Sequence, residues 1–132
     1  MKILLSACLI LAAALAASVS RADDTWLPPV SESVARADDL YGGGAYAQAY
    51  AEYFAAAIRG HARAQEVIGM MLLLGPEMYG PDIERNRESA LRWLEEAARA
   101  GRDVSWHVAL AIKQRDAAAG LATAPLDTSR RH

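Results

Sequence analysis

Glycines divide residues 31–120 into five short segments, and within each segment the apolar residues recur at helical spacing. Glycine commonly follows the last turn of a helix because it accepts a positive φ without strain. The predicted helix ends are Gly42, Gly60, Gly75, Gly101 and Gly120. No segment shows the alternation of apolar and polar residues that is typical of a strand. The sequence therefore predicts an all-α fold with about five helices.

Polar residues and prolines indicate where these helices begin. The two prolines in DDTWLPPV oppose helix formation, so residues 23–30 are expected to be extended, and Ser31 to be the N-cap of the first helix. Asn86 is the predicted N-cap of the fourth helix, and Asp103 begins the fifth. Residues 75–85, GPEMYGPDIER, contain two Gly-Pro steps and are predicted to form a loop.

The third segment, AQEVIGMMLLLG at residues 64–75, is apolar on two faces of the expected helix. A helix of this kind is buried between neighbours, and about twelve residues are too few to span a bilayer. Gly69 lies inside it, although glycine costs roughly 1 kcal/mol relative to alanine in a helix interior. We therefore expect another helix to approach closely at Gly69.

The sequence matches itself when it is shifted by 41 residues. Residues 49–60 then coincide with residues 90–101 at a first alanine, an alanine pair and a final glycine. A period of this size indicates stacked helix hairpins. Small residues at matching positions would allow consecutive helices to approach each other closely.

The repeated residues carry a resemblance to a known family. Residues 64–101 contain A-Q-x-x-I-G-x-M-x-x-x-G followed by N-x-x-S-A-x-x-W-x-x-x-A-A-x-x-G, which resembles one full Sel1-like repeat. Residues 44–62 resemble the hairpin that often opens such arrays and is related to tetratricopeptide hairpins. The resemblance covers residues 33–112.

Several positions depart from the family pattern. Leu72 replaces its tyrosine, Asn86 its aspartate and Ser89 its lysine, and the loop after Gly75 is about five residues longer than usual. Leu110 of the last helix stands where Gly69 stands in the repeat. The last helix is therefore expected to be a terminal cap and not part of another repeat.

The resemblance implies a short right-handed α/α solenoid of helix hairpins over residues 31–120. It also implies a protein that binds another protein through its concave face, as an adaptor or regulator in a process of the bacterial envelope. The alternative is an envelope hydrolase or a peptidoglycan-active enzyme. Cysteine-rich relatives have been linked to such activity, but the only cysteine of this chain is Cys8.

The start of the chain has the pattern of a secretory signal peptide. Lys2 provides the positive charge, an apolar stretch follows, and small residues precede Asp23, so residues 1–22 are expected to be removed and the protein to be periplasmic or secreted. Retention as an anchor helix is the alternative. Cys8 resembles an acylated lipoprotein cysteine but comes too early in the chain. At the other end, residues 121–132 are predicted to form a flexible tail.

The charge balance argues against a polyanionic partner. Removal of the signal would leave 12 basic against 16 acidic residues, a formal charge of −4 in place of −2. A mildly acidic domain lacks the basic surface that nucleic acid or an anionic membrane requires. We therefore expect a protein partner, no nucleic acid and no stable membrane insertion after cleavage.

The residues offer little for catalysis. His132 lies in the tail, His61 follows Gly60 in a turn that is common in the family, and His107 neighbours Trp106. No pair of histidines or cysteine cluster has the spacing of a metal site, and no serine nucleophile motif is present. We expect no catalytic residue, no metal and no cofactor, and therefore no enzyme.

Three apolar or aromatic residues are the candidates for binding a protein. Met78 and Tyr79 lie in the lengthened loop, and Trp106 lies on the last helix. Side chains of this kind are enriched at interfaces, although core packing is the alternative for each. Trp93 is expected to pack in the core, because the family uses its position for packing.

Overall fold

The computed structural model describes residues 27–123, and all regular secondary structure in this part is helical. The helices are α2 (Val30–Gly42), α3 (Tyr46–Ile58), α4 (Ala62–Leu74), α5 (Pro76–Tyr79), α6 (Arg87–Arg99) and α7 (Asp103–Thr123). The prediction of an all-α fold is therefore confirmed for the described residues. The predicted signal peptide lies outside them, as does most of the predicted tail.

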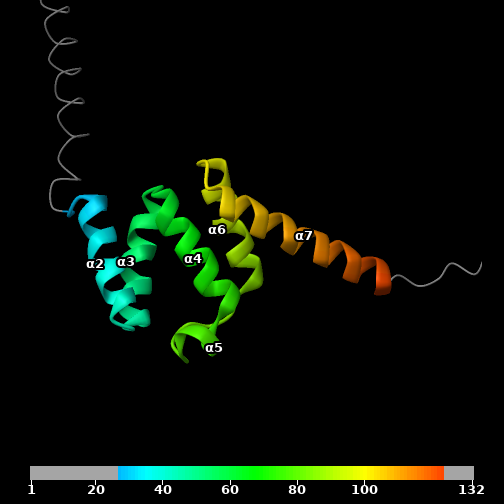
Figure 1. Cartoon of the computed structure of the whole chain (residues 1–132), viewed down its shortest axis with the longest axis horizontal. Coiled ribbons are helices and arrows are strands. Elements are labelled where there is room, and N and C mark those ends of the chain that lie inside the picture. The colour runs from blue at the N-terminus through cyan, green and yellow to red at the C-terminus, as the bar shows by residue number, and fades with distance from the viewer. Residues whose placement is uncertain (1–26, 124–132) are drawn as a thin grey trace, which may run out of the picture.

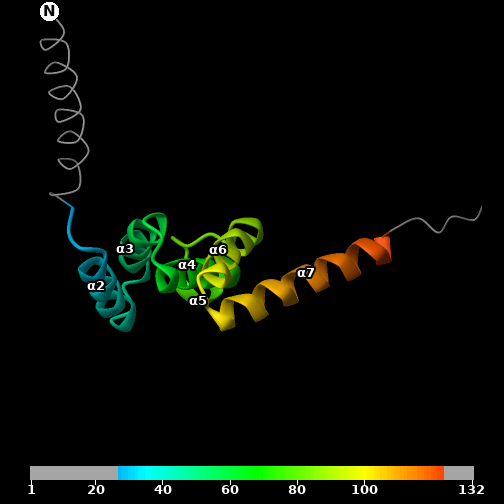
Figure 2. The ribbon, with the colours of Figure 1, turned by 90° about the horizontal axis from the view of Figure 1, so that it is seen from above.

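Successive long helices pack side by side, and the chain reverses direction between them (Figure 1). The most extensive packing joins α4 to α6 and α2 to α3, followed by α3 to α4 and α6 to α7. Seen from above, α3 and α6 lie on one side of α4, whereas α2 and the beginning of α7 lie on the other (Figure 2). The second half of α7 extends beyond the other helices.

The 41-residue repeat corresponds to a repeated helix end. Gly60 and Gly101, which close the matching segments, have φ angles of +85° and +87°. After each glycine, the amide of the next residue donates to the first alanine of the preceding Ala-Ala pair, at 3.1 Å and 3.0 Å. These bonds satisfy carbonyls that would otherwise lack partners at the helix end. Both glycines therefore turn the chain in the same way, the first into α4 and the second into α7.

The predicted helix starts are partly wrong. Helix α2 begins at Val30, and its N-cap is Pro29, whose carbonyl accepts two amide bonds from the first turn. Ser31 is therefore inside the first turn and is not the cap. In contrast, Asn86 Oδ1 accepts the Ser89 amide at 2.9 Å, which confirms the predicted cap of α6.

Residues 75–85 are not a loop throughout, because they contain the short helix α5. Gly75 ends α4 with a φ of +68°, and Gly80 ends α5 with a φ of +88°. Between them Pro76 occupies the first helical position, where its fixed φ suits the helix and its missing N–H loses no bond. Pro76, one of the two prolines that predicted a loop, therefore starts a helical turn, whereas Pro81 follows the end of α5.

The predicted end of the last helix is also wrong, because α7 runs through Gly120 to Thr123. Gly120 is not among the glycines with positive φ. A glycine inside a helix costs only about 1 kcal/mol, so it does not by itself stop one. Residues 121–123, assigned to the tail from the sequence, belong to the helix.

Helices α4 and α6 approach each other closely at Gly69. A Cβ atom added there would lie 2.7 Å from Leu94 Cγ and 3.2 Å from the Ala90 carbonyl oxygen. Leu94 has no exposed surface, and a packed interior leaves a displaced side chain little room to move. The expected close contact at Gly69 is confirmed, and α4 is covered by α3 as well as by α6.

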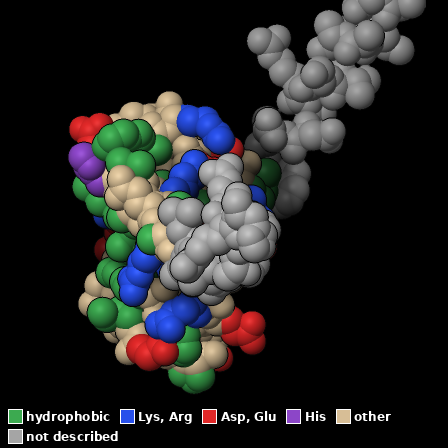
Figure 3. All heavy atoms as spheres, turned by 90° about the vertical axis from the view of Figure 1, so that its right-hand side faces the viewer, with side chains coloured by type: hydrophobic (Ala, Val, Ile, Leu, Met, Phe, Trp, Pro, Cys, Tyr) green, Lys and Arg blue, Asp and Glu red, His purple; other side chains and the backbone are tan. Residues whose placement is uncertain are grey.

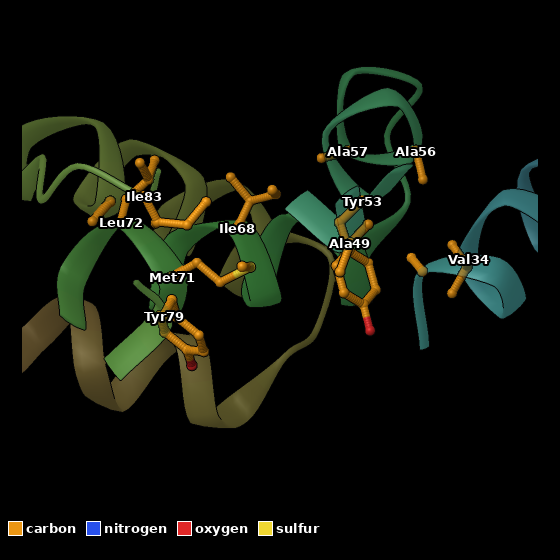
Figure 4. Packing of buried hydrophobic residues seen from close by; sticks show 13 residues of the cluster. Val34, Ala49, Tyr53, Ala56, Ala57, Ile68, Met71, Leu72, Tyr79 and Ile83 are labelled. Carbon is orange, nitrogen blue, oxygen red and sulfur yellow. The ribbon is translucent and has the colours of Figure 1, made fainter. Parts of the chain in front are cut away.

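The main core lies where α2, α3, α4 and α5 meet (Figure 4). Its labelled residues are Val34, Ala49, Tyr53, Ala56, Ala57, Ile68, Met71, Leu72, Tyr79 and Ile83. A smaller cluster, formed by Leu94, Ala109 and Ile112, joins α6 to α7. The two clusters hold the described helices together.

A polar cluster ties α4 to the beginning of α7. Glu66 of α4 forms an ion pair with Arg102, and Ser105 Oγ donates to Glu66 Oε2 at 2.7 Å. The Glu66 side chain is only 13% exposed, and Ser105 is fully buried. The hydrogen bond from Arg102, supported by that from Ser105, holds the pKa of Glu66 below its ordinary value of 4.5.

This cluster leads to a pH-dependent prediction. We expect Glu66→Gln to lower the free energy of unfolding by about 1–2 kcal/mol at neutral pH, because a charge-assisted bond is lost and its donors remain. Because folding lowers the Glu66 pKa, its contribution is complete above pH 4.5 and disappears as the pH falls below that value. The variant should therefore approach the wild type in stability under acidic conditions, as measured by urea unfolding across pH.

The control is Glu96→Gln, which changes an exposed carboxylate paired with Arg99 on the surface of α6. An exposed pair of this kind contributes at most about 1 kcal/mol. Equal effects of the two substitutions at neutral pH would show that the Glu66 cluster does not stabilise the fold.

Candidate functional site

The structure separates the three residues that the sequence singled out for binding. Met78 is 59% exposed on α5, and Trp106 is 53% exposed on α7, whereas Tyr79 is only 9% exposed. Helix α5 follows the end of α4, and α7 begins beside the start of α4, so the two exposed residues lie at opposite ends of the α4–α6 hairpin (Figure 1). They do not form one site.

The prediction that Tyr79 presents its ring to a partner is wrong. Its hydroxyl lies 3.1 Å from the Tyr41 hydroxyl, and its ring packs edge-on against Tyr46 with 5.2 Å between centroids. Burial, together with the hydrogen bond to Tyr41, raises the pKa of Tyr79 above its ordinary value. Tyr79 therefore holds α5 against the first hairpin and belongs to the core.

A groove with exposed aromatic surface lies between α3 and α6. Phe54 of α3 is 39% exposed. It stacks on Tyr50, one turn earlier, with 6.0 Å between ring centroids and 17° between planes. On its other side it meets Trp93 of α6 edge-on, at 5.8 Å and 78°. We call the groove lined by the rings of Tyr50, Phe54 and Trp93 the aromatic groove.

Two hollows include residues of the aromatic groove in their lining. One, of about 440 Å³, is lined by Phe54, Trp93, Ser89, Arg92 and Glu96. Another, of about 340 Å³, extends from Tyr50 over Leu72 and Ile83 to the polar residues Asp82, Glu84, Arg85 and Asn86. Apolar rings therefore lie in the middle of this surface, with charged side chains around them, which is the usual arrangement at a protein interface.

The rim of the first hollow is held in place by local bonds. Arg92 donates to Glu88 at 2.7 Å and to Ser89 Oγ at 2.8 Å. Tyr50, the ring on which Phe54 stacks, is partly buried, and this burial raises its pKa. The groove is therefore preorganised, which lowers the entropy that a partner loses on binding.

Trp106 lies beside a separate hollow of about 330 Å³ between α6 and α7. The other lining residues are Glu95, Ala98, Arg99, Ala109, Leu110 and Lys113, of which Lys113 and Glu95 form an ion pair. His107 packs edge-on against the Trp106 ring at 4.9 Å. This exposed ring is accessible from solvent, but it lies outside the aromatic groove.

The described histidines occupy different surroundings. His61 is the N-cap of α4, where Nδ1 accepts the Ala64 amide at 3.3 Å, and His107 contacts Trp106. Within residues 27–120 no group of three or more His, Cys, Asp or Glu side chains could hold a metal ion. The cap formed by His61 has a structural role, as its place in a glycine turn suggests.

Sequence reasoning missed Phe54 as a surface residue. Tyr50 and Phe54 are spaced by four residues, so they lie on one face of α3. Trp93 packs against the core, as expected, and also forms one wall of the groove. The local signal was a pair of aromatics at helical spacing on α3, and the contact with Trp93 of α6 depends on the fold.

No family model, curated protein or solved structure matches the chain. Among the described helices, none is both long and apolar enough to cross a bilayer. By its fold, the described part of the chain is a set of packed helix hairpins in which the same type of helix end occurs twice.

Proposed function

We propose that this chain is a Sel1-like helical repeat protein of the bacterial envelope whose function is to bind another protein. The observation that carries the proposal is the aromatic groove, where a partly exposed phenylalanine lies between a tyrosine and a tryptophan. Aromatic residues surrounded by charged side chains are typical of the residues that dominate binding energy at interfaces. The groove is the strongest candidate for such a surface in the described part of the chain.

The repeat supports the solenoid part of the proposal. The two matching segments end in the same glycine geometry, and each leads into a helix at the same offset, α4 after the first and α7 after the second. Leu110 of α7 occupies the position of Gly69 and is exposed. A leucine side chain at this position would keep another helix from approaching α7 as closely as α6 approaches Gly69 of α4. This supports the interpretation of α7 as a terminal cap.

Periplasmic or secreted localisation completes the proposal and rests on the first 22 residues of the sequence, which lie outside the described residues. The apolar stretch after Lys2 and the small residues before Asp23 support it. The envelope is therefore the compartment in which a partner should be sought.

Site-specific photocrosslinking in the host tests the proposed surface. A photoreactive phenylalanine analogue would replace Phe54, and in separate variants Met78 and Trp106, which remain candidates because they are exposed. We expect a discrete protein adduct from position 54. Phe54→Ala should weaken capture of that adduct partner at least about tenfold, since a central aromatic anchor is worth 1–2 kcal/mol or more.

The matched control is Ala55, which is also exposed on α3 but points about 100° away from Phe54 around the helix. The analogue at position 55 should give no adduct. Adducts from Met78 or Trp106 alone would move the binding surface away from the groove, and no adduct from any of the three positions would contradict the proposed function.

A further inference from the structure

A fourth hollow, of different chemistry, lies between α4 and α7. It measures about 460 Å³ and is lined by Leu73, Leu74, Arg85, Arg87, Val108, Ala111, Ile112 and Arg115. The lining thus consists of five apolar residues and three arginines, with no carboxylate. Figure 3, which faces the end of the molecule toward which α7 points, shows Lys and Arg side chains among hydrophobic ones.

Two of the arginines are held in place by hydrogen bonds to neighbouring helices. Arg85 Nη2 donates to the Leu74 carbonyl and to Glu77, both at 2.8 Å. Arg87 Nη2 donates to Asp116 at 2.7 Å and to the Ile112 carbonyl at 3.4 Å. Each uses one nitrogen for these bonds, and a guanidinium has five N–H donors, so both retain donors for a ligand.

Arg115 differs from the other two arginines. Its side chain forms no hydrogen bond or ion pair with any other described residue and is exposed at the edge of the hollow. Glu77 and Asp116 balance the charges of Arg85 and Arg87, so Arg115 supplies the unbalanced positive charge. An occupant should therefore combine an apolar side chain with one or two negative charges.

We propose that this hollow binds a peptide segment in which an apolar side chain is flanked by carboxylates. The apolar side chain would contact Leu73, Val108 and Ala111, and a carboxylate would pair with Arg115. Arginine binds carboxylates in a planar, two-bond geometry, which adds specificity to the charge attraction. The site contains none of Tyr50, Phe54 and Trp93 and shares only Arg85 with the hollows beside the aromatic groove.

The neighbouring carboxylates favour a peptide over a polyanion. A nucleic acid or an anionic bilayer would bring several phosphates against Glu77 and Asp116 as well as against the arginines. A peptide can place a single carboxylate at Arg115 and insert an apolar side chain between α4 and α7. Such a segment matches the unbalanced positive charge of Arg115 and the apolar lining of the hollow beside it.

The test uses two labelled synthetic peptides of equal length with a central leucine, flanked by aspartates in one and by lysines in the other. Fluorescence anisotropy with the full chain should show saturable binding of the aspartate peptide only. Arg115→Glu should weaken that binding at least about tenfold, and Ala111→Glu should do the same by placing a carboxylate in the hollow. Amide chemical shifts of α7 should change on binding.

Two variants serve as controls. Arg99→Glu makes the same change of charge at an exposed arginine on α6 that pairs with Glu96, and it should leave binding within about twofold. Phe54→Ala should also leave it unchanged, so a failure of the aromatic groove and a failure of this site are distinguishable. Circular dichroism melting of each variant checks that the fold is intact.

Three results would overturn the proposal. The lysine peptide could bind as well as the aspartate peptide, or Arg99→Glu could weaken binding as much as Arg115→Glu. Alternatively, the protein could bind phosphatidylglycerol vesicles in an Arg115-dependent manner without binding the aspartate peptide, which would assign the hollow to a lipid surface.

Discussion

Replacing Tyr79 by alanine is expected to lower the free energy of unfolding by about 3–5 kcal/mol, the range measured for truncating a large buried aromatic side chain. The ring is almost fully buried and contacts Tyr41 and Tyr46. Its removal leaves a cavity between α5 and the first hairpin and takes away the hydrogen-bond partner of the Tyr41 hydroxyl. Urea unfolding followed by circular dichroism measures the loss.

Met78 provides the control for this substitution, because it is adjacent in sequence, lies on the same short helix and is mostly exposed. Met78→Ala should change stability by less than about 0.5 kcal/mol, as is usual for surface positions. If both substitutions had equally small effects, α5 would not be packed against the core in solution. If Met78→Ala were the more destabilising, the roles of the two side chains would be reversed.

Replacing Gly69 by leucine is expected to destabilise the protein by about 3 kcal/mol, at the upper end of the usual effect of overpacking. The first added atom already comes within 2.7 Å of Leu94 Cγ, and the Ala90 carbonyl closes the space beside it. Leucine has the better helix propensity by less than about 1 kcal/mol, so the clash dominates. For a domain of this size the melting temperature should fall by roughly 12–20 °C.

Gly42→Leu is the matched control, because Gly42 is also helical but a Cβ atom there has no neighbour within 4 Å. That substitution should leave the melting temperature unchanged or slightly raised. A Gly69→Leu variant as stable as the wild type would show that α4 and α6 cross elsewhere.

Features that follow from local sequence patterns were predicted well. The apolar stripes identified the long helices, because burial of one face imposes a period of 3.6 residues. Gly69 indicated a close contact because a glycine inside an apolar helix needs an explanation in packing. Asn86 was recognised as a cap by its residue type and by the polar segment that follows.

Features that depend on tertiary contacts were missed. Helix α5 has only four residues, too few to show the period of a helix, and the two Gly-Pro steps around it predicted a loop. Nothing local to Tyr79 reveals that Tyr41, 38 positions earlier in the chain, accepts or donates its hydrogen bond. The candidate site was missed for the same reason, since Phe54 gains its significance from Trp93 on another helix.

The order of packing along the chain has a consequence for cooperativity. Most contacts join long helices that follow one another along the chain. Helix α4 has the most partners, because it packs against α3, α5 and α6. Segments with few contacts to the rest of a protein can open locally without global unfolding. We therefore expect the outer part of α7 to unfold locally without disturbing α2. Global unfolding requires the contacts around α4 to be lost, so these contacts determine its free energy.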